Sequence, residues 1–335
     1  MAALPTGALT IADWGKRVDP DGKIATVIEL LAQTNELLTD MKWLEGNLPT
    51  GHRSTVRTGL PAVTWRRINN GVTPSKSTTA QIDENAGILE AWSEVDKDLA
   101  ELNGDIAAFR LSEARAFLEA MNQQMSAVVF YGNQGLTPEE FNGLAPRYAD
   151  STLGNGSNII KAGGTGSDNT SIWLVVWGDQ TVHGIFPKGS KAGLIHEDFG
   201  EQTVVVGTGI GGARLRAYQE RFQWKAGIAV RDWRYVVRIC NIDISNLVAD
   251  STPFSADLLK LMAKAWHRIP TMGMGTAVFY CNRTIQMWLD IQARETVTTG
   301  GQLKYEVVDG KPITSFRGIP IRRCDALLET EATVP

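Results

Sequence analysis

A glycine-rich pattern that follows a strand-like run could bind a dinucleotide. The run is Thr203–Val206, and the glycines after it are Gly207, Gly209 and Gly212. In a dinucleotide-binding fold these glycines approach a pyrophosphate, and an acidic residue about twenty positions later binds the ribose, where this chain has Asp232. Such a site also needs a helix N-terminus after the glycines. The alternation over Phe222–Val230 predicts a strand instead, and leaves too few residues for a crossover helix. We therefore interpret the glycines as a turn, expect no cofactor, and keep a nucleotide-binding oxidoreductase as a distant alternative.

Other residues with metal-binding or catalytic side chains are poorly placed for chemistry. His196, Glu197 and Asp198 are consecutive. In an extended segment neighbouring side chains point to opposite faces, so three convergent metal ligands are not expected. The remaining histidines have no Cys or carboxylate at ligand spacing, and we predict that each is a surface or hydrogen-bonded residue; they are His52, His183 and His267. The chain has no P-loop, His-Glu-x-x-His or Gly-x-Ser-x-Gly motif. We predict that the protein is not an enzyme.

Charge is segregated into two adjacent blocks. Between residues 51 and 82 the only charged side chains are basic: Arg53, Arg57, Arg66, Arg67 and Lys76. The block that follows has one lysine and eight acidic residues: Asp83, Glu84, Glu90, Glu94, Asp96, Asp98, Glu101 and Asp105. Segregated charge steers association more than it stabilises a fold. We predict that the basic block contacts the acidic block of another copy, through the five basic residues and the acidic residues from Asp83 to Asp98.

The basic block has the pattern of an extended hairpin. Asn69-Asn70-Gly71 predicts a tight turn between two strands, and Pro74 restricts the second strand to an edge. A hairpin with so few large apolar residues cannot order itself alone, so it needs a neighbour. The alternative is a solvated mobile loop. Trp65 and Ile68 favour the neighbour, because mobile tails rarely carry such side chains.

Helical periodicity identifies two elements on either side of these blocks. Apolar spacing predicts an amphipathic helix from about Lys23 to Leu44. A longer helix is predicted over Ile106–Tyr131, with Asn103 or Asp105 as its N-cap. Its apolar stripe is Ala107, Leu111, Ala114, Leu118, Met121, Met125 and Val128. We expect this face, with Leu118 at its middle, to be buried.

The second half of the chain alternates strands with helices. Ile172–Trp177 and Val182–Phe186 are predicted to form a hairpin, and so are Phe222–Val230 and Trp233–Ile239. The last third predicts a helix from Pro253 to Trp266, a strand at Thr276–Cys281, a helix capped by Asn282 and a strand at Ile319–Leu327. This order indicates a compact α/β unit at the C-terminus.

Composition excludes several classes of protein. The 335 residues carry a net charge of −4, which argues against a dedicated nucleic-acid binder, and 43% hydrophobic content supports a sizeable core. No apolar run is long enough to span a membrane, and no signal peptide is visible. Three cysteines in strand-like stretches are typical of reduced, buried thiols: Cys240, Cys281 and Cys324.

The order of these parts resembles the major capsid protein of tailed bacteriophages. The local sequences that carry the resemblance are Phe130–Asn133, Pro138, Phe141–Leu144, Arg147-Tyr148 and Trp224–Ile239. The resemblance covers nearly the whole chain. It implies an α+β fold with an N-terminal arm at residues 1–50, an extended loop at 51–82, a peripheral domain at 83–226 with a spine helix at 104–131 and a β-insertion, and an axial domain at 227–335.

The resemblance also implies a function. Copies of the chain would form hexamers and pentamers of an icosahedral head enclosing double-stranded DNA, which they contact non-specifically. The protein would be located in the virion capsid after assembly in the host cytoplasm, without a membrane. A separate scaffolding protein and a portal are expected as partners, and a decoration protein is compatible with the resemblance. No cross-link between neighbouring copies is predicted. The near alternative is a host-encoded protein nanocompartment of the same fold, which would hold a cargo enzyme instead of DNA.

Overall fold

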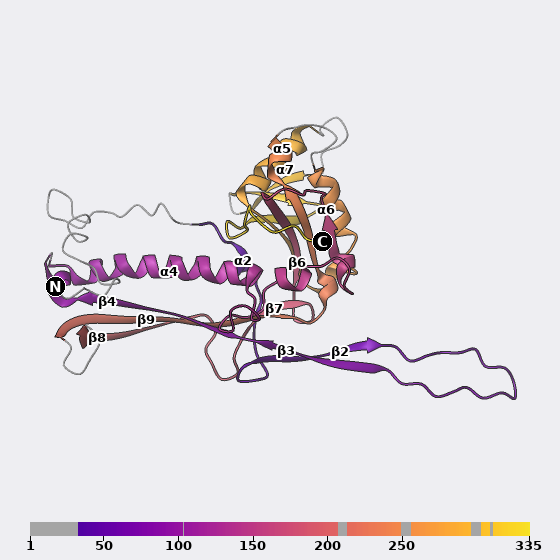
Figure 1. Cartoon of the computed structure of the whole chain (residues 1–335), viewed down its shortest axis with the longest axis horizontal. Helices are drawn as coiled ribbons and strands as arrows, with labels where there is room; N and C mark the ends of the chain where they lie inside the picture. Colours follow the sequence, from indigo (N-terminus) through magenta and orange to yellow (C-terminus); the bar gives the residue numbers. More distant parts are fainter. Residues whose placement is uncertain (1–32, 103, 207–212, 249–255, 296–302, 309–310) are drawn as a thin grey trace. The chain divides into compact units, whose positions relative to one another are not determined.

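The computed structural model describes residues 33–102, 104–206, 213–248, 256–295, 303–308 and 311–335. It confirms a mixed α+β fold, whose elements are shown in Figure 1. The first part of the helix predicted from Lys23 to Leu44, up to residue 32, lies outside the described residues. Beyond that point the prediction is wrong, because only the short helix α2 (Leu37–Asp40) forms, and β1 (Trp43–Glu45) is a strand. Trp43–Glu45 pair with β7 (Val182–Phe186) in parallel instead of continuing a helix.

The chain divides into two compact units. Among the described residues, the first contains 33, 88–125 and 193–225, and the second contains those within 34–87, 126–192 and 226–335. Residues 126–192 therefore group with the C-terminal part of the chain. The division into an arm, an extended loop, a peripheral domain and an axial domain follows other boundaries, and stays a prediction.

The second unit is built around a fully buried central strand, β6 (Asn169–Trp177). It pairs antiparallel with β10 (Val236–Asp243) and with β11 (Thr276–Cys281). The sheet continues from β11 through β14 (Ile319–Arg323), β13 (Lys311–Phe316) and β12 (Leu303–Val308), and from β10 to β5 (Ile159–Lys161). Besides α2 and the last turns of the long helix that ends at Tyr131, the described helices of this unit are α5 (Ile244–Val248), α6 (Leu258–Trp266) and α7 (Arg283–Glu295). Its short 3-10 turns are η1 (Ala145–Tyr148), η2 (Gly156–Asn158), η3 (Trp233–Tyr235) and η4 (Met272–Met274).

The core of the second unit joins this sheet to two helices. Ile172, Leu174 and Val176 of β6 are buried together with Met262 of α6 and Ile285 of α7. Asn282 begins α7 as predicted, because its side-chain oxygen accepts a hydrogen bond from the Ile285 amide at 2.8 Å. The helices and strands predicted for the last third are therefore present among the described residues, although the last strand ends at Arg323 and not at Leu327. The three cysteines are buried and free, as predicted from their strand-like surroundings: Cys240, Cys281 and Cys324.

Two predicted hairpins are wrong. The strand β7 (Val182–Phe186) meets β6 only at the parallel bridge between Trp177 and Val182, and it pairs instead with β1 and with β9 (Ala213–Val230). The strands β9 and β10 do not pair with each other either: η3 separates them, and each joins other strands. Alternation of apolar and polar residues within a strand indicates which of its faces is buried, but it does not identify the strand with which it pairs.

The first unit contains most of the long helix α4 (Ile106–Tyr131), whose bounds are those predicted. With it are β8 (Leu194–Val206), most of β4 (Gly87–Asp96) and of β9, and the short helix α3 (Lys97–Glu101). The buried face of α4 in this unit consists of Phe109, Ala114, Met121 and Met125, with Phe117 partly buried. Leu111 and Leu118 are 55% and 40% exposed. The predicted stripe is therefore confirmed in part: Ala114, Met121 and Met125 are buried, whereas Leu111 and Leu118 are exposed. The aromatic side chains of Phe109 and Phe117, which were not in the predicted stripe, face the core instead.

The predicted hairpin is present in the second unit. The strands β2 (Gly51–Gly59) and β3 (Thr78–Asn85) pair antiparallel and form a two-stranded sheet of their own. The turn lies slightly before the predicted residues, since the Asn70 amide donates to the Arg67 carbonyl and Asn69 has a φ of 63°. Residues 60–77 connect the strands as an extended loop, and every residue from Leu60 to Asp83 is exposed. No helix in the described part of the chain is long and apolar enough to cross a membrane.

Candidate functional site

The first basic residue of the hairpin is neutralised within the chain. Arg53 on β2 donates two hydrogen bonds to the Asp83 carboxylate on β3, each 2.6 Å long. The pair holds the pKa of Asp83 below its usual value, mainly through the hydrogen bond. Both side chains are about half exposed.

A second pair fixes the base of the hairpin. Glu84 is 5% exposed and accepts two hydrogen bonds from the Arg147 guanidinium, 2.5 and 2.6 Å long. Arg147 also donates to the carbonyls of Asn142 and Gly143. A two-pronged, buried arginine–carboxylate pair of this kind holds geometry closely. Residues of the Phe141–Leu144 and Arg147-Tyr148 segments therefore anchor β3.

The other acidic residues of the predicted contact make hydrogen bonds without forming ion pairs in the described part of the chain. Glu90 accepts from the Trp92 indole and from Gln223, which lowers its pKa. Glu94 accepts from Gln219. Asp96 caps α3 by accepting from the Asp98 amide. These four carboxylates, Glu90, Glu94, Asp96 and Asp98, keep their charge available to a partner.

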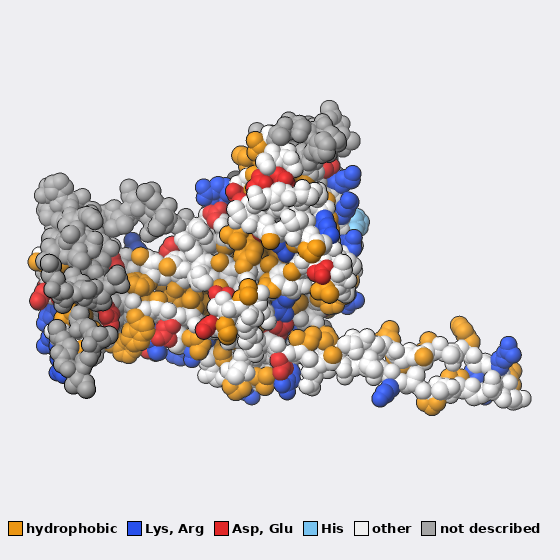
Figure 2. All heavy atoms as spheres, viewed as in Figure 1, with side chains coloured by type: hydrophobic (Ala, Val, Ile, Leu, Met, Phe, Trp, Pro, Cys, Tyr) orange, Lys and Arg blue, Asp and Glu red, His pale blue; other side chains and the backbone are white. Residues whose placement is uncertain are grey.

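The remaining basic residues of the hairpin form no ion pair with any residue that the structure describes. They are Arg57, Arg66, Arg67 and Lys76, and all four are exposed. Among them lie large apolar side chains that are also exposed: Leu60 by 81%, Val63 by 89%, Trp65 by 103% and Ile68 by 92%. We call residues 60–77 the hairpin tip. Figure 2 shows the apolar and basic side chains side by side on it.

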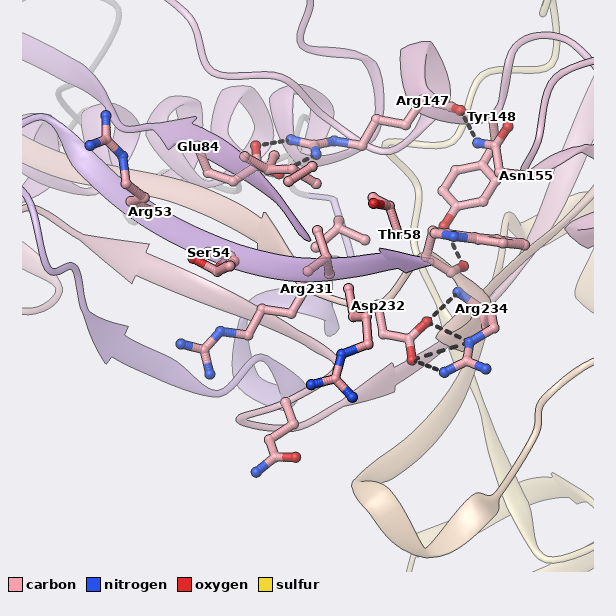
Figure 3. Close-up of a pocket in the computed structure, with 18 residues that line it drawn as sticks. Arg53, Ser54, Thr58, Glu84, Arg147, Tyr148, Asn155, Arg231, Asp232 and Arg234 are labelled. Carbon is pink, nitrogen blue, oxygen red and sulfur yellow. Dashed lines mark hydrogen bonds and ion pairs between the residues drawn. The ribbon is translucent and has the colours of Figure 1, made fainter. Parts of the chain in front are cut away.

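A cavity of about 1050 Å³ lies at the root of the hairpin. Figure 3 shows it between β2, which carries Ser54 and Thr58, and the ion pairs Arg147–Glu84 and Arg234–Asp232. Five arginines and two carboxylates line it: Arg53, Arg57, Arg147, Arg231, Arg234, Glu84 and Asp232. The cavity is therefore positively charged.

Two buried histidines adjoin this cavity, contrary to the prediction that they are surface or fully hydrogen-bonded residues. The rings of His52 and His183 meet edge to face with centroids 5.6 Å apart. Arg231 Nη2 lies 2.9 Å from Nε2 of His52, which must therefore accept the hydrogen bond. Both ring nitrogens of His183 are buried without a hydrogen-bond partner among the described residues. Burial, followed by the Arg231 charge, lowers the pKa of His183 to about 4 and also lowers that of His52.

The three consecutive residues considered as metal ligands bind three different partners. His196 contacts Glu220 at 3.0 Å, Glu197 pairs with Arg221, and Asp198 pairs with Arg110 at 2.7 Å. Glu197 therefore points to the opposite face from its two neighbours, as expected for an extended strand. His196 and Asp198 share a face, where their partners Glu220 and Arg110 also pair with each other. Among the described residues no group of three His, Cys, Asp or Glu side chains could hold a metal ion.

The glycine pattern connects two neighbouring strands. Gly207, Gly209 and Gly212 lie outside the described residues, but β8 before them and β9 after them pair antiparallel as far as Val206 and Ala213. A dinucleotide site requires a crossover to a parallel strand, so this connection does not fit one. Asp232 is also engaged, since it caps η3 and pairs with Arg234 at 2.7 Å.

Comparison with known proteins identifies the family. Residues 19–335 match the family described as Major capsid protein GP7. The chain belongs to this family. A search of curated proteins finds no match.

Solved structures agree. The chain is 36% identical to a chain in the structure of Bacteriophage Epsilon15, with a TM-score of 0.79, and the match covers 100% of this chain and 99% of the other. Matches to other solved structures are weaker. A chain of Microbacterium phage Oxtober96 is 13% identical with a TM-score of 0.41, over 69% of this chain and 98% of that one. A chain of the encapsulin complex of Synechococcus elongatus is 10% identical with a TM-score of 0.39, over 70% and 96%. The protein is therefore a phage major capsid protein, a structural component of the virion that assembles with copies of itself.

Proposed function

We propose that copies of this chain form the hexamers and pentamers of an icosahedral head around double-stranded DNA, and that the hairpin tip carries the contact between neighbouring copies. The observation that supports this contact is the exposure of Trp65, Ile68 and Leu60 next to unpaired arginines. An exposed apolar group of this size marks an interaction site. Assembly takes place in the host cytoplasm, with a separate scaffolding protein and a portal.

The acceptor surface on the neighbouring copy is acidic. Glu90, Glu94, Asp96 and Asp98 retain their charge without an ion pair among the described residues, whereas Asp83 and Glu84 have partners within the chain. We therefore assign the contact to Arg57, Arg66, Arg67 and Lys76 on one copy and to these four carboxylates on the next. Arg53 joins the two strands of the hairpin through its ion pair with Asp83.

Charge reversal tests this contact. Replacing Arg66 and Arg67 by Glu leaves the subunit folded, because both side chains are exposed, and blocks particle formation through like-charge repulsion. Exposed pairs individually contribute only ~0–1 kcal/mol, so two reversals repeated at every copy are needed for a clear defect. The matched control is Lys188→Glu with Lys191→Glu, which changes the net charge equally at positions outside the hairpin. Negative-stain microscopy measures the particle yield; equal yields from both variants would contradict the proposed contact.

The host-encoded nanocompartment is the second candidate for the shell. Nucleic-acid extraction from purified particles distinguishes the two. Double-stranded DNA in the particles supports a viral head, and a cargo enzyme without DNA supports the compartment.

A further inference from the structure

A row of basic side chains lies on and just after α6 in the second unit. Lys260, Lys264 and Arg268 follow each other at intervals of four residues, and all three are exposed. The chain contains no acidic residue from Leu258 to Leu289. None of the three basic side chains forms an ion pair with a residue that the structure describes. Figure 2 shows Lys and Arg side chains gathered over this helix.

The packing of α6 directs this row to solvent. Met262 and Ala265 are fully buried in the core of the second unit, so the two lysines lie on the opposite face of the helix. Asp257, the acidic residue just before the helix, is used as its N-cap. The guanidinium of Arg268 donates to the carbonyl of Ser157, which carries no charge. The positive charge of the row is therefore not neutralised by these contacts.

Arg317 adds a fourth positive charge beside the end of α6. With Gly318 it forms the two-residue turn between β13 and β14, and its φ of 52° is one that an arginine rarely adopts. Its guanidinium carbon lies 5.2 Å from the centroid of the Trp266 ring. Its Nη1 donates to Nε2 of His267 at 3.3 Å. These contacts hold the charge in place without a carboxylate from the described residues. We call the four side chains the basic stripe: Lys260, Lys264, Arg268 and Arg317.

The basic stripe differs from the hairpin tip in the kind of partner that it fits. The hairpin tip exposes large apolar side chains among its arginines, whereas no large apolar side chain between Leu258 and Gly273 is exposed. Positive charge without apolar anchors is typical of contacts to phosphates, which are independent of base sequence. Phosphates recur about every 3.4 Å along each strand of a duplex. The row from Lys260 to Arg268, about 12 Å long at about 1.5 Å per residue, therefore passes three to four of them, by order of magnitude.

We propose that the basic stripe binds the phosphate backbone of double-stranded DNA without reading its sequence. This site rests on the proposed function, because a head that encloses DNA brings the duplex against its subunits. The net charge of −4 argues against a dedicated nucleic-acid binder. At physiological ionic strength, however, charges interact over about 8 Å, so the local charge of the basic stripe decides whether a phosphate is attracted.

Binding of the full-length, unassembled subunit to a fluorescent DNA duplex tests this site. Lys260→Gln with Lys264→Gln should weaken binding by a factor of about ten or more at low salt. The slope of log affinity against log salt concentration should fall by about two, because two phosphate contacts are lost. The matched control is Lys188→Gln with Lys191→Gln, which removes the same charge at exposed positions outside α6. Equal losses in both variants, or no loss in the first, would overturn the proposal.

A substitution in the turn separates binding from folding. Arg317→Asn places a residue that readily adopts a positive φ at this position, so the turn is preserved. Its thermal unfolding should match that of the wild type, while the salt slope should fall by about one. Unchanged affinity of this variant for the duplex would overturn the assignment of Arg317 to the site.

Two further measurements separate this site from other sites and partners. Arg66→Gln with Arg67→Gln should weaken binding less than the α6 variant; a larger loss would place the duplex on the hairpin tip and overturn the proposal. Poly-glutamate should compete for the subunit less well than unlabelled duplex at the same concentration of charge. Stronger competition by poly-glutamate would assign the basic stripe to an acidic protein segment in place of DNA.

Failure of this site is distinguishable from failure of the proposed function. Particles that contain DNA, formed by subunits whose affinity for a duplex does not depend on the basic stripe, would leave the viral head in place and overturn the site. Particles without DNA would contradict the enclosure of DNA. In that case the binding measurements on unassembled subunits still decide whether the basic stripe binds a duplex.

Discussion

A buried ion pair fixes the end of the chain in the second unit. Arg238 and Glu331 are 2.8 Å apart, with side chains 5% and 4% exposed. Arg238 also donates to Ser171 and to the Tyr148 carbonyl, and Glu331 accepts from Tyr131. Both members of the pair therefore have further hydrogen-bond partners. A network of this kind specifies one arrangement of the segments it joins.

Removing one member of this pair should be severe. Glu331→Ala leaves a buried guanidinium without its counter-charge, and we expect a loss of about 3–5 kcal/mol in the free energy of unfolding. The control is Asp83→Ala, which breaks an ion pair that is half exposed and should change stability little. Urea unfolding of the unassembled subunits measures both. Equal, small losses would show that Arg238 finds another partner or water.

Titration of His183 should couple stability to pH. Its pKa is about 4 in the folded subunit and 6.5 as the ordinary value, so between these values the unfolded state binds a proton that the folded state does not. The free energy of unfolding should fall as pH falls from about 6.5 to about 4, by on the order of 3 kcal/mol at about 1.36 kcal/mol per pKa unit. The groups facing it are Arg231, His52 and Asp179; His52 adds a change of the same sign.

The pH dependence of a variant isolates this effect. His183→Leu should be less sensitive than the wild type to pH between about 4 and 6.5, whereas His267→Gln, at an exposed position, should match the wild type. Unfolding by urea at a series of pH values gives the comparison. An unchanged slope in His183→Leu would show that other groups carry the dependence.

The long helix α4 shows what local sequence can and cannot predict. Its bounds followed from periodicity over many turns, which is a local property. Its buried face followed only in part, because Ala114, Met121 and Met125 of the predicted stripe are buried, but Phe109 and Phe117 face the core in place of Leu111 and Leu118. Strand pairing was missed for a related reason. The buried strand β6 takes β10 and β11 as neighbours, and no pattern within it encodes partners so far along the chain.

A pair of truncations tests the face of α4. Met121 is 4% exposed and Leu118 is 40% exposed. Met121→Ala should cost about 2–5 kcal/mol, because it removes buried atoms and leaves a cavity. Leu118→Ala should cost much less, since little of that space is enclosed. Thermal or urea unfolding separates the two variants, and a loss from Leu118→Ala as large as that from Met121→Ala would show that the buried face includes Leu118, as predicted from the sequence.

The candidate contact was only partly readable from the sequence. The two charge blocks are visible as composition, and the exposed hairpin agrees with the need for a neighbour. The sequence did not show which charged residues pair with each other within one chain. Arg53 meets Asp83 only through the register of β2 and β3, and Glu84 meets Arg147 only through tertiary structure. Fewer charged side chains therefore stay without an ion pair among the described residues than the sequence suggests. The positive charge is concentrated on the hairpin tip and on the cavity at the root of the hairpin.

The contact that we propose at the hairpin tip combines two forces that respond differently to salt. Electrostatic attraction between exposed groups weakens as ionic strength rises, whereas burial of apolar surface does not. Trp65→Ser with Ile68→Ser removes the apolar part. Because both side chains are exposed in the subunit, its thermal unfolding should be unchanged, but each lost burial should weaken the contact by ~1.5–3 kcal/mol.

The matched control removes two exposed leucines elsewhere, through Leu136→Ser with Leu153→Ser, which are 82% and 59% exposed. Particle yield by light scattering should fall for the tip variant at every salt concentration and stay normal for the control. Extra salt should lessen the like-charge repulsion in the Arg66→Glu, Arg67→Glu variant but should not restore the apolar one. Normal assembly of the Trp65, Ile68 variant would show that charge alone guides the hairpin tip to its neighbour, and that its large apolar side chains stay in solvent within the shell.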